Sequence, residues 1–156
     1  MDYKFSTVRE EAGYTEHLLV NDKVHYGRAI KGGHIGVLFF DDTKTQMAAM
    51  VRYKLVDVVP SDWETLNNLP EGGKYCVPFS LNSFASGAGA ELLNTMRMTT
   101  GYDVVTFSPK SERVAEFHLN NGAELYAESS TCKNYRYGVW EEKSEGSARR
   151  RLLYRG

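Results

Sequence analysis

The stretch that decides the fold is KYCVPFSLNSFASGAGAELLNTMRMT, residues 74–99. An apolar run at its start, residues 75–79, is typical of a buried strand. Small residues follow over positions 83–90, with Gly87 and Gly89 two apart, and the apolar side chains that come next have helical spacing. The stretch therefore predicts a strand, a turn of small residues and a helix.

The turn between this strand and helix suits an anionic ligand. A helix start carries unpaired N–H groups and a partial positive charge, and glycines let a ligand approach the main chain. Phosphate is the natural ligand, although glycine also serves tight packing. No Lys follows Gly89, so the nucleotide-binding P-loop is excluded, and the third glycine of the dinucleotide motif is missing.

Length and composition indicate one globular domain. The chain has 156 residues, 42% of them hydrophobic and 25% charged, and a net charge of −1 that does not by itself indicate nucleic acid. Cys76 and Cys132 form no Cys/His cluster, so no disulfide and no metal site is predicted. We expect a reduced, cytoplasmic setting, with no membrane span and no signal peptide.

The other elements predict a mixed α/β sheet with helices on both faces. A capping box, Ser61 with Glu64 three residues on, predicts a short helix, and Ser108-Pro109 predicts the start of another that ends near Gly122. We expect one domain over residues 1–141 and a charged, basic tail over 142–156. The expected strands cover residues 3–8, 34–42, 46–59, 75–79, 102–107, 123–128 and 134–141, and the expected helices 10–20, 61–68, 91–99 and 109–122. Residues 23–30 are expected to form either a second short helix or an irregular segment.

Two motifs, placed within this order of strands and helices, resemble those of the GCN5-related N-acetyltransferases, the GNAT superfamily. Their acetyl-CoA loop has the form [QR]xxGx[GA] after the fourth strand, and residues 84–89, FASGAG, match it except that Phe84 replaces Gln or Arg. Residues 112–123 resemble the second motif, with Glu112 in place of Asn and His118 in place of Tyr. The resemblance covers residues 2–141 and implies a GNAT-like fold with a central, mostly antiparallel sheet.

The resemblance also implies a reaction, which is transfer of an acetyl group from acetyl-CoA to an amine of a small molecule or a protein. His118 would return a proton to the leaving thiolate, as the family's Tyr does, if its pKa lies near neutrality. The main-chain N–H groups that would hold the pyrophosphate of acetyl-CoA belong to Phe84, Ala85, Ser86, Gly87, Ala88, Gly89 and Ala90.

A general base is not evident from the sequence. Residues 75–84 contain no Asp or Glu, and Asp103 lies at a strand start, which leaves Glu64 acting through water as a candidate. His118 could equally be a packed histidine. The chain lacks four features of the family: the Arg or Gln of the acetyl-CoA loop, the Tyr and the Asn of the second motif, and an evident base. A catalytically silent GNAT-fold binding protein would show these losses together. The other histidines are weaker candidates: His17, His25 and His34.

A third hypothesis concerns nucleic acid. The pair His25-Tyr26 before the strand GVLFFD, residues 36–41, resembles phage Mom-type DNA adenine modifiers, which are GNAT-fold enzymes. Their Asp on the fifth strand has no counterpart, since residues 108–110, SPK, stand there. Basic residues beside an aromatic one could contact phosphates by charge and bases by stacking. Those residues lie in the tail: Arg149, Arg150, Arg151 and Arg155.

Overall fold

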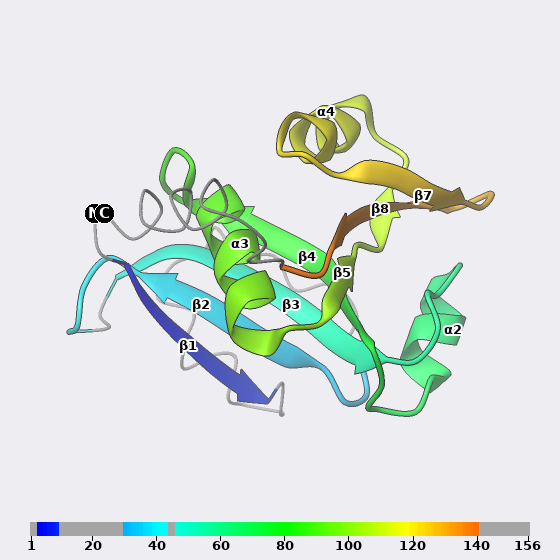
Figure 1. The fold of residues 1–156 in the computed structure, drawn as a ribbon, viewed down its shortest axis with the longest axis horizontal. Helices are drawn as coiled ribbons and strands as arrows, with labels where there is room; N and C mark the ends of the chain where they lie inside the picture. The colour runs from blue at the N-terminus through cyan, green and yellow to red at the C-terminus, as the bar shows by residue number, and fades with distance from the viewer. Residues whose placement is uncertain (1–2, 10–29, 44–45, 141–156) are drawn as a thin grey trace.

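The structure, a computed structural model, describes residues 3–9, 30–43 and 46–140. Within these residues eight strands form one sheet in the order β1-β2-β3-β4-β5-β8-β6, with β7 paired to the other edge of β8 (Figure 1). The strands are β1 (Lys4–Arg9), β2 (His34–Phe39), β3 (Met47–Val56), β4 (Tyr75–Ser83), β5 (Asp103–Val105), β6 (Ser108–Pro109), β7 (Glu124–Glu128) and β8 (Cys132–Gly138). The helices are α2 (Trp63–Asn68), α3 (Ala88–Thr100) and α4 (Glu112–Asn120).

The sheet is mixed, as expected, because β4 and β5 run parallel while the other pairs are antiparallel. Its centre, β3, is buried over nearly its whole length. On one face, Leu92 and Met96 of α3 pack with Val51 of β3. The opposite face holds a separate cluster that includes Val37 and Met50. Alternation along β2 and β3 thus supplies apolar side chains to both sides of the sheet.

Helix α2 lies on the face opposite α3, where Leu66 packs with Val77 of β4. Its N-cap is Asp62, whose carboxylate accepts the Thr65 N–H at 2.7 Å, so the prediction of Ser61 as the cap is wrong by one residue. At the other end of the helix, the buried Lys54 ammonium donates to the Leu66 carbonyl at 2.8 Å. Both ends of this short helix are therefore capped by side chains.

The predicted boundaries of the second half need correction. Ser108 and Pro109 form β6 instead of a helix start, because they pair with Lys133 and Cys132 of β8. Helix α4 begins at Glu112, behind the N-cap Ser111. Cys132, which lies between the predicted strands over 123–128 and 134–141, begins β8, and its thiol forms no disulfide and is buried. The glycine predicted at the end of α4 is there, with a φ of +94°.

Several predictions fall on residues that the structure does not describe. They are the helix over 10–20, most of the short helix or irregular segment over 23–30, and the basic tail over 142–156. Among the described helices, none is both long and apolar enough to cross a membrane.

The sheet parts between β4 and the segment that follows β5. These strands pair at two positions near their starts, and the Phe107 N–H then donates to the Pro78 carbonyl at 2.8 Å. Beyond Pro78, β4 continues along β3 as far as Ser83, whereas Ser108 and Pro109 pair with β8. In Figure 1, the branch made of α4, β7 and β8 accordingly stands apart from the layer of β1 to β4.

Candidate functional site

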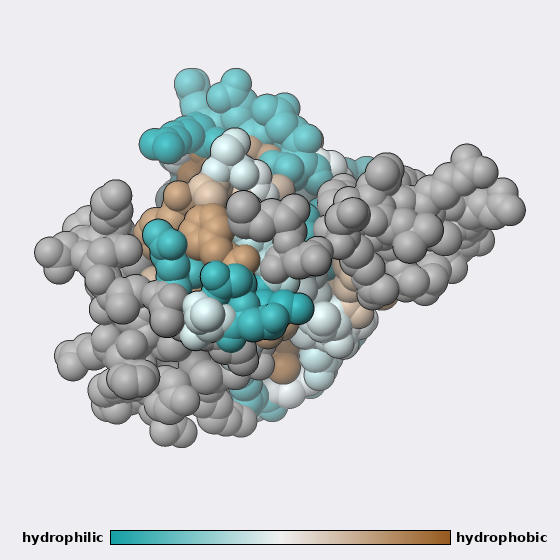
Figure 2. Space-filling view, turned by 90° about the vertical axis from the view of Figure 1, so that its left-hand side faces the viewer, coloured by the Kyte–Doolittle hydropathy of each residue, from teal (hydrophilic) through white to brown (hydrophobic). Residues whose placement is uncertain are grey.

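A cleft of about 530 Å³ lies where β4 and β6 part. Its lining includes Pro78 and Phe107, so it begins where the hydrogen bonding between the two strands ends. Leu93 of α3 and Val114 and Phe117 of α4 add apolar side chains. Figure 2, a view onto the side toward which β4 runs, shows apolar residues gathered between hydrophilic ones. The charged and hydrogen-bonding side chains along the cleft are Ser80, Ser83, Thr106, Ser108, Arg113 and His118.

The turn between β4 and α3 presents free N–H groups beside this cleft. Ser83, at its start, lines the cleft. The N–H of Ala88 donates to Ala85 O at 3.1 Å, and the N–H of Gly89 donates to the Ser83 hydroxyl at 3.1 Å. Four other N–H groups have no acceptor among the described residues, and they belong to Ala85, Ser86, Gly87 and Ala90. A helix start with four unpaired donors is suited to an anion.

The two glycines of the turn serve different purposes. Gly87 is the N-cap of α3 and has a φ of +77°, a conformation that favours glycine, with open space where a side chain would lie. A Cβ on Gly89 would lie 3.2 Å from the Ser83 Cβ, so this glycine allows close packing of the helix on β4.

Phe84 differs from the rest of the predicted loop. Its N–H donates to Ala48 O at 2.8 Å, and its ring packs against the apolar cluster that includes Val37 and Met50. Phe84 is therefore a partly buried packing residue, and its N–H already has an acceptor and is not available to a ligand.

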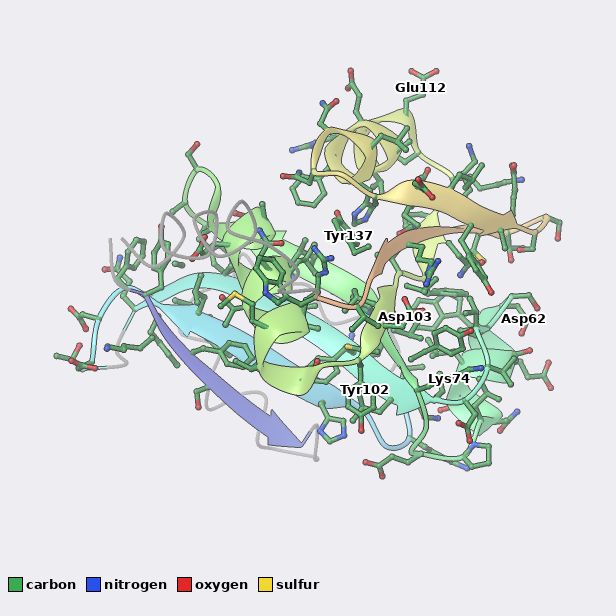
Figure 3. The ribbon with its side chains drawn as sticks, in the orientation of Figure 1. Asp62, Lys74, Tyr102, Asp103, Glu112 and Tyr137 are labelled. Atoms are coloured by element: carbon green, nitrogen blue, oxygen red, sulfur yellow. The ribbon has the colours of Figure 1, made fainter. Side chains whose placement is uncertain are left out.

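His118 lies on α4 with its ring buried against β8. Its Nδ1 is 2.6 Å from the Tyr137 hydroxyl, its Nε2 is 3.4 Å from Ser108 Oγ, and the Tyr135 ring stacks on it. Figure 3 shows Tyr137 in the space between β8 and α4. Burial lowers the pKa of His118 to about 4, so the imidazole is neutral at neutral pH. The condition that the sequence analysis set for a proton donor, a pKa of His118 near neutrality, is therefore not met.

Other sequence candidates lie away from the cleft or outside the described residues. Asp103 pairs with Arg136 at 3.1 Å. His34 pairs with Glu71 at 3.0 Å, and Glu64 is exposed in the first turn of α2; neither lines the cleft. His17 and His25 are not among the described residues.

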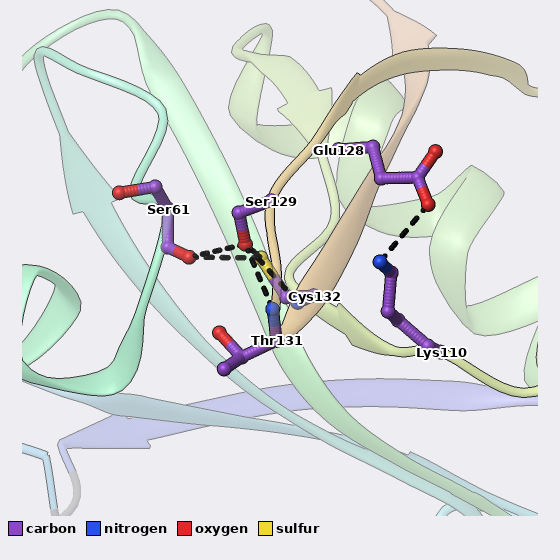
Figure 4. Close-up of polar contacts among 6 residues, drawn as sticks. All are labelled: Ser61, Lys110, Glu128, Ser129, Thr131 and Cys132. Atoms are coloured by element: carbon purple, nitrogen blue, oxygen red, sulfur yellow. Dashed lines mark hydrogen bonds and ion pairs between the residues drawn. The ribbon is translucent and has the colours of Figure 1, made fainter.

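Opposite the cleft, the turn between β7 and β8 is fastened to the segment before α2 (Figure 4). The Ser129 hydroxyl and the Cys132 thiol both donate to the Ser61 carbonyl, at 2.9 Å and 3.2 Å. An ion pair of 3.1 Å joins Lys110, before α4, to Glu128 at the end of β7. The bonds to Ser61 therefore join the C-terminal half of the sheet to the segment before α2, and the ion pair lies within the C-terminal half.

A comparison with solved structures finds proteins of similar fold. Arabidopsis thaliana NAA60 in complex with a bisubstrate analogue aligns with a TM-score of 0.50 and 11% identity, over 87% of this chain and 98% of NAA60. The chain has the GNAT fold.

Two other GNAT-fold comparisons are weaker. A protein of Desulfovibrio desulfuricans assigned to the GNAT family aligns at a TM-score of 0.45 and 17% identity, over 69% of this chain and 70% of that one. AtaTR bound with AcCoA aligns at a TM-score of 0.44 and 11% identity, over 80% of this chain and 76% of AtaTR. No family model matches the sequence, and no curated protein matches it. At these identities the likeness concerns the GNAT fold alone.

The resemblance to Mom-type DNA modifiers finds no support among these structures. His25-Tyr26, which suggested it, lies outside the described residues. The nucleic-acid partner expected from the tail is likewise unsupported.

The sequence did not indicate Ser108, Thr106 or Tyr137 as site residues. The sequence predicts Ser108 at a helix start, and it predicts Tyr137 only as one residue of the strand over 134–141. Their meeting at His118 depends on the pairing of β6 with β8, which brings residues 108 and 133 side by side. No local motif encodes that contact.

Proposed function

We propose that this protein is an acyl-CoA-dependent N-acyltransferase that moves the acetyl group of acetyl-CoA to an amine. The observation that carries the proposal is the cleft at the parting of β4 and β6, adjoined by a helix start with four unpaired N–H groups. Acetyl-CoA is a long, flexible thioester with a diphosphate at one end, and it matches both features. Its diphosphate needs hydrogen-bond donors, and its pantetheine arm needs an apolar channel.

In this proposal the diphosphate binds the N–H groups of Ala85, Ser86, Gly87 and Ala90. The pantetheine arm follows the apolar walls of the cleft toward Phe107, and the thioester reaches Ser108 and His118. The exposed Arg113 on the cleft wall adds positive charge for the phosphates. NAA60 carries a bisubstrate analogue, which supports the same use of the fold here.

His118 takes the proton-transfer role. The leaving thiolate must gain a proton, and His118 is the titratable group on the cleft wall whose ring nitrogen faces a hydroxyl there. Because the ring is neutral, it has to receive a proton during the reaction before it can give one up.

The anion site is tested by calorimetry with acetyl-CoA. Ser86 is exposed within the turn, so Ser86→Glu places a negative charge beside the free N–H groups without disturbing the core. We expect the dissociation constant to rise by about tenfold or more, a loss of about 1.4 kcal/mol.

Ser86→Gln is the matched control, because it has the same length without the charge. We expect its affinity to stay within about twofold of the wild type. Equal affinities for all three proteins would show that the diphosphate does not bind this turn.

A catalytically silent GNAT-fold binding protein is the second candidate. It is favoured by the internal hydrogen bonds of Ala88 and Gly89, which occupy two N–H groups of the turn, and by the neutral His118. A thiol-detection assay with acetyl-CoA and a panel of primary amines separates the two. Binding of acetyl-CoA without release of free CoA, with every amine, would favour the silent protein.

A further inference from the structure

Ser83, the last residue of β4, lies where the cleft meets the turn before α3. Its side chain is exposed and lines the cleft. Its hydroxyl donates to the Ala85 carbonyl at 2.8 Å and accepts the Gly89 N–H at 3.1 Å. Both directions are determined, because a carbonyl oxygen can only accept a hydrogen bond and a main-chain N–H can only donate one. One side chain therefore bridges the two ends of the turn.

The bond to Gly89 caps α3. The N-cap residue of this helix is Gly87, which has no side chain to accept an N–H group of the first turn. Ser83 supplies that acceptor from outside the helix. Gly89 is buried against β4, where a Cβ would lie 3.2 Å from the Ser83 Cβ and 3.6 Å from Leu81 Cδ2. Without the hydroxyl, a buried N–H would lose its acceptor, which costs free energy.

The bond to Ala85 sets the direction of a neighbouring donor. The Ala85 carbonyl accepts both the Ser83 hydroxyl and the Ala88 N–H, so it is held on the side of the turn where these two groups lie. The peptide unit that joins Ala85 to Ser86 is trans, and a trans unit directs its C=O and its N–H to opposite sides. The Ser86 N–H therefore points away from the Ser83 hydroxyl.

Few other contacts hold the turn in this shape. Its start is anchored by the Phe84 N–H, which donates to the Ala48 carbonyl. Beyond that anchor, Ser86 is exposed, and a Cβ on Gly87 would have no heavy atom within 4 Å. Among the described residues, the side-chain hydrogen bonds to the main chain of this turn come from Ser83. The shape of the turn thus depends on this hydroxyl.

We propose, on the basis of the acyltransferase function inferred above, that Ser83 is a positioning residue for acetyl-CoA. Its hydroxyl holds the turn in the shape in which the four unpaired N–H groups meet the diphosphate. A loop that already has its bound shape loses less conformational freedom when the ligand binds, so the affinity is higher. The hydrogen bonds inside the turn then support cofactor binding instead of competing with it.

The test compares two ligands of the full chain. Acetyl-CoA carries the diphosphate, whereas S-acetylpantetheine carries the same thioester arm without it. Calorimetry gives the dissociation constant of acetyl-CoA, and an NMR titration of the isotope-labelled protein gives that of the weaker S-acetylpantetheine. In Ser83→Ala we expect the dissociation constant to rise by about tenfold for acetyl-CoA and to stay within about twofold of the wild type for S-acetylpantetheine. A hydroxyl that only stabilised the fold would not produce this difference between the ligands.

Thr95→Val is the matched control for the loss of a hydroxyl. The Thr95 hydroxyl donates to the Glu91 carbonyl at 2.8 Å within α3, and Thr95 does not line the cleft. We expect its affinity for acetyl-CoA to stay within about twofold of the wild type.

A second pair of variants decides the test if Ser83→Ala does not fold. Ser83→Thr keeps the hydroxyl, and Ser83→Val has the same shape without it. The position is exposed, which leaves space for the added methyl groups. We expect Ser83→Thr to bind acetyl-CoA within about twofold of the wild type, and Ser83→Val to bind it about tenfold more weakly than Ser83→Thr.

The outcomes separate this proposal from the proposed function. Unchanged affinity of Ser83→Ala for acetyl-CoA, or equal affinities of Ser83→Thr and Ser83→Val, would overturn the positioning role and leave the acyltransferase intact. Equal losses for both ligands would do the same. Tighter binding by Ser83→Ala would also overturn it, since the hydroxyl would then be blocking the Gly89 N–H. Wild-type protein that does not bind acetyl-CoA would overturn both.

Discussion

At the scale of the residue, the most informative group is the imidazole of His118. Its ring is enclosed by Tyr135, Phe117 and Tyr137, and none of these carries a charge that would favour protonation. Burial lowers its pKa to about 4 for that reason. In the unfolded chain His118 becomes protonated near pH 6.5, whereas in the folded protein it stays neutral until the pH approaches about 4.

This difference predicts a stability loss in acid. Between pH 6.5 and about 4 the unfolded chain binds the His118 proton and the folded chain does not, so the free energy of unfolding falls as the pH falls. The His118 contribution amounts to roughly 3 kcal/mol over that range. Urea unfolding of His118→Gln should show a flatter pH dependence by about that amount.

Tyr135→Phe is the control for that measurement, since it keeps the imidazole and the ring stacked on it. We expect it to follow the wild-type pH dependence. Parallel curves for wild type and His118→Gln would mean that His118 titrates normally in the folded protein.

At the scale of the element, the sequence predicted well those segments whose signals are local. The β4–α3 junction and the β2–β3 hairpin carry their own periodicity and turn residues, and the structure places them where expected. Ser108-Pro109 has the local chemistry of a helix start, but pairing with β8 overrides it. The cap of α2 was missed because Ser61 and Asp62 are both good capping residues.

The corrected cap leads to a stability prediction for α2. Asp62→Ala removes the carboxylate that accepts the Thr65 N–H, so we expect the free energy of unfolding to fall by about 1 kcal/mol. In Ser61→Ala the capping carboxylate and the carbonyl that anchors the β7–β8 turn are both retained, so a change below about 0.5 kcal/mol is expected. A larger loss for Ser61→Ala in urea unfolding would restore the original assignment of the cap.

At the scale of the whole molecule, the site exists because two halves of one sheet diverge. The sequence predicted the glycine turn and the position of His118 on a helix, and both lie beside the cleft. It could not predict Ser108 or Tyr137 as partners of that histidine, because they meet it only through long-range strand pairing. Local periodicity contains no information on which strands become neighbours.

Filling the cleft tests this arrangement directly. Val114 lines the cleft from α4, so Val114→Trp should weaken acetyl-CoA binding by more than about tenfold while the protein stays folded. Glu116→Trp adds the same ring to the exposed side of the helix and should bind normally.

Thermal unfolding gives an independent readout of the same prediction. Acetyl-CoA at about 100 times its dissociation constant should stabilise the wild type and Glu116→Trp by about 2.7 kcal/mol and leave Val114→Trp almost unchanged. Equal stabilisation of all three proteins would place the ligand elsewhere.

The parallel junction between β4 and β5 concentrates the contact between the two halves of the sheet in a few hydrogen bonds. β4 is bound to β3 along most of its length but to β5 at two positions, and the Phe107 N–H adds one further bond to Pro78. The cleft opens directly beyond that last bond, so its width depends on whether the bond stays closed. Slow amide exchange at Phe107 would show that the cleft keeps its width in solution, whereas exchange as fast as at the chain surface would show that the edge of the cleft opens.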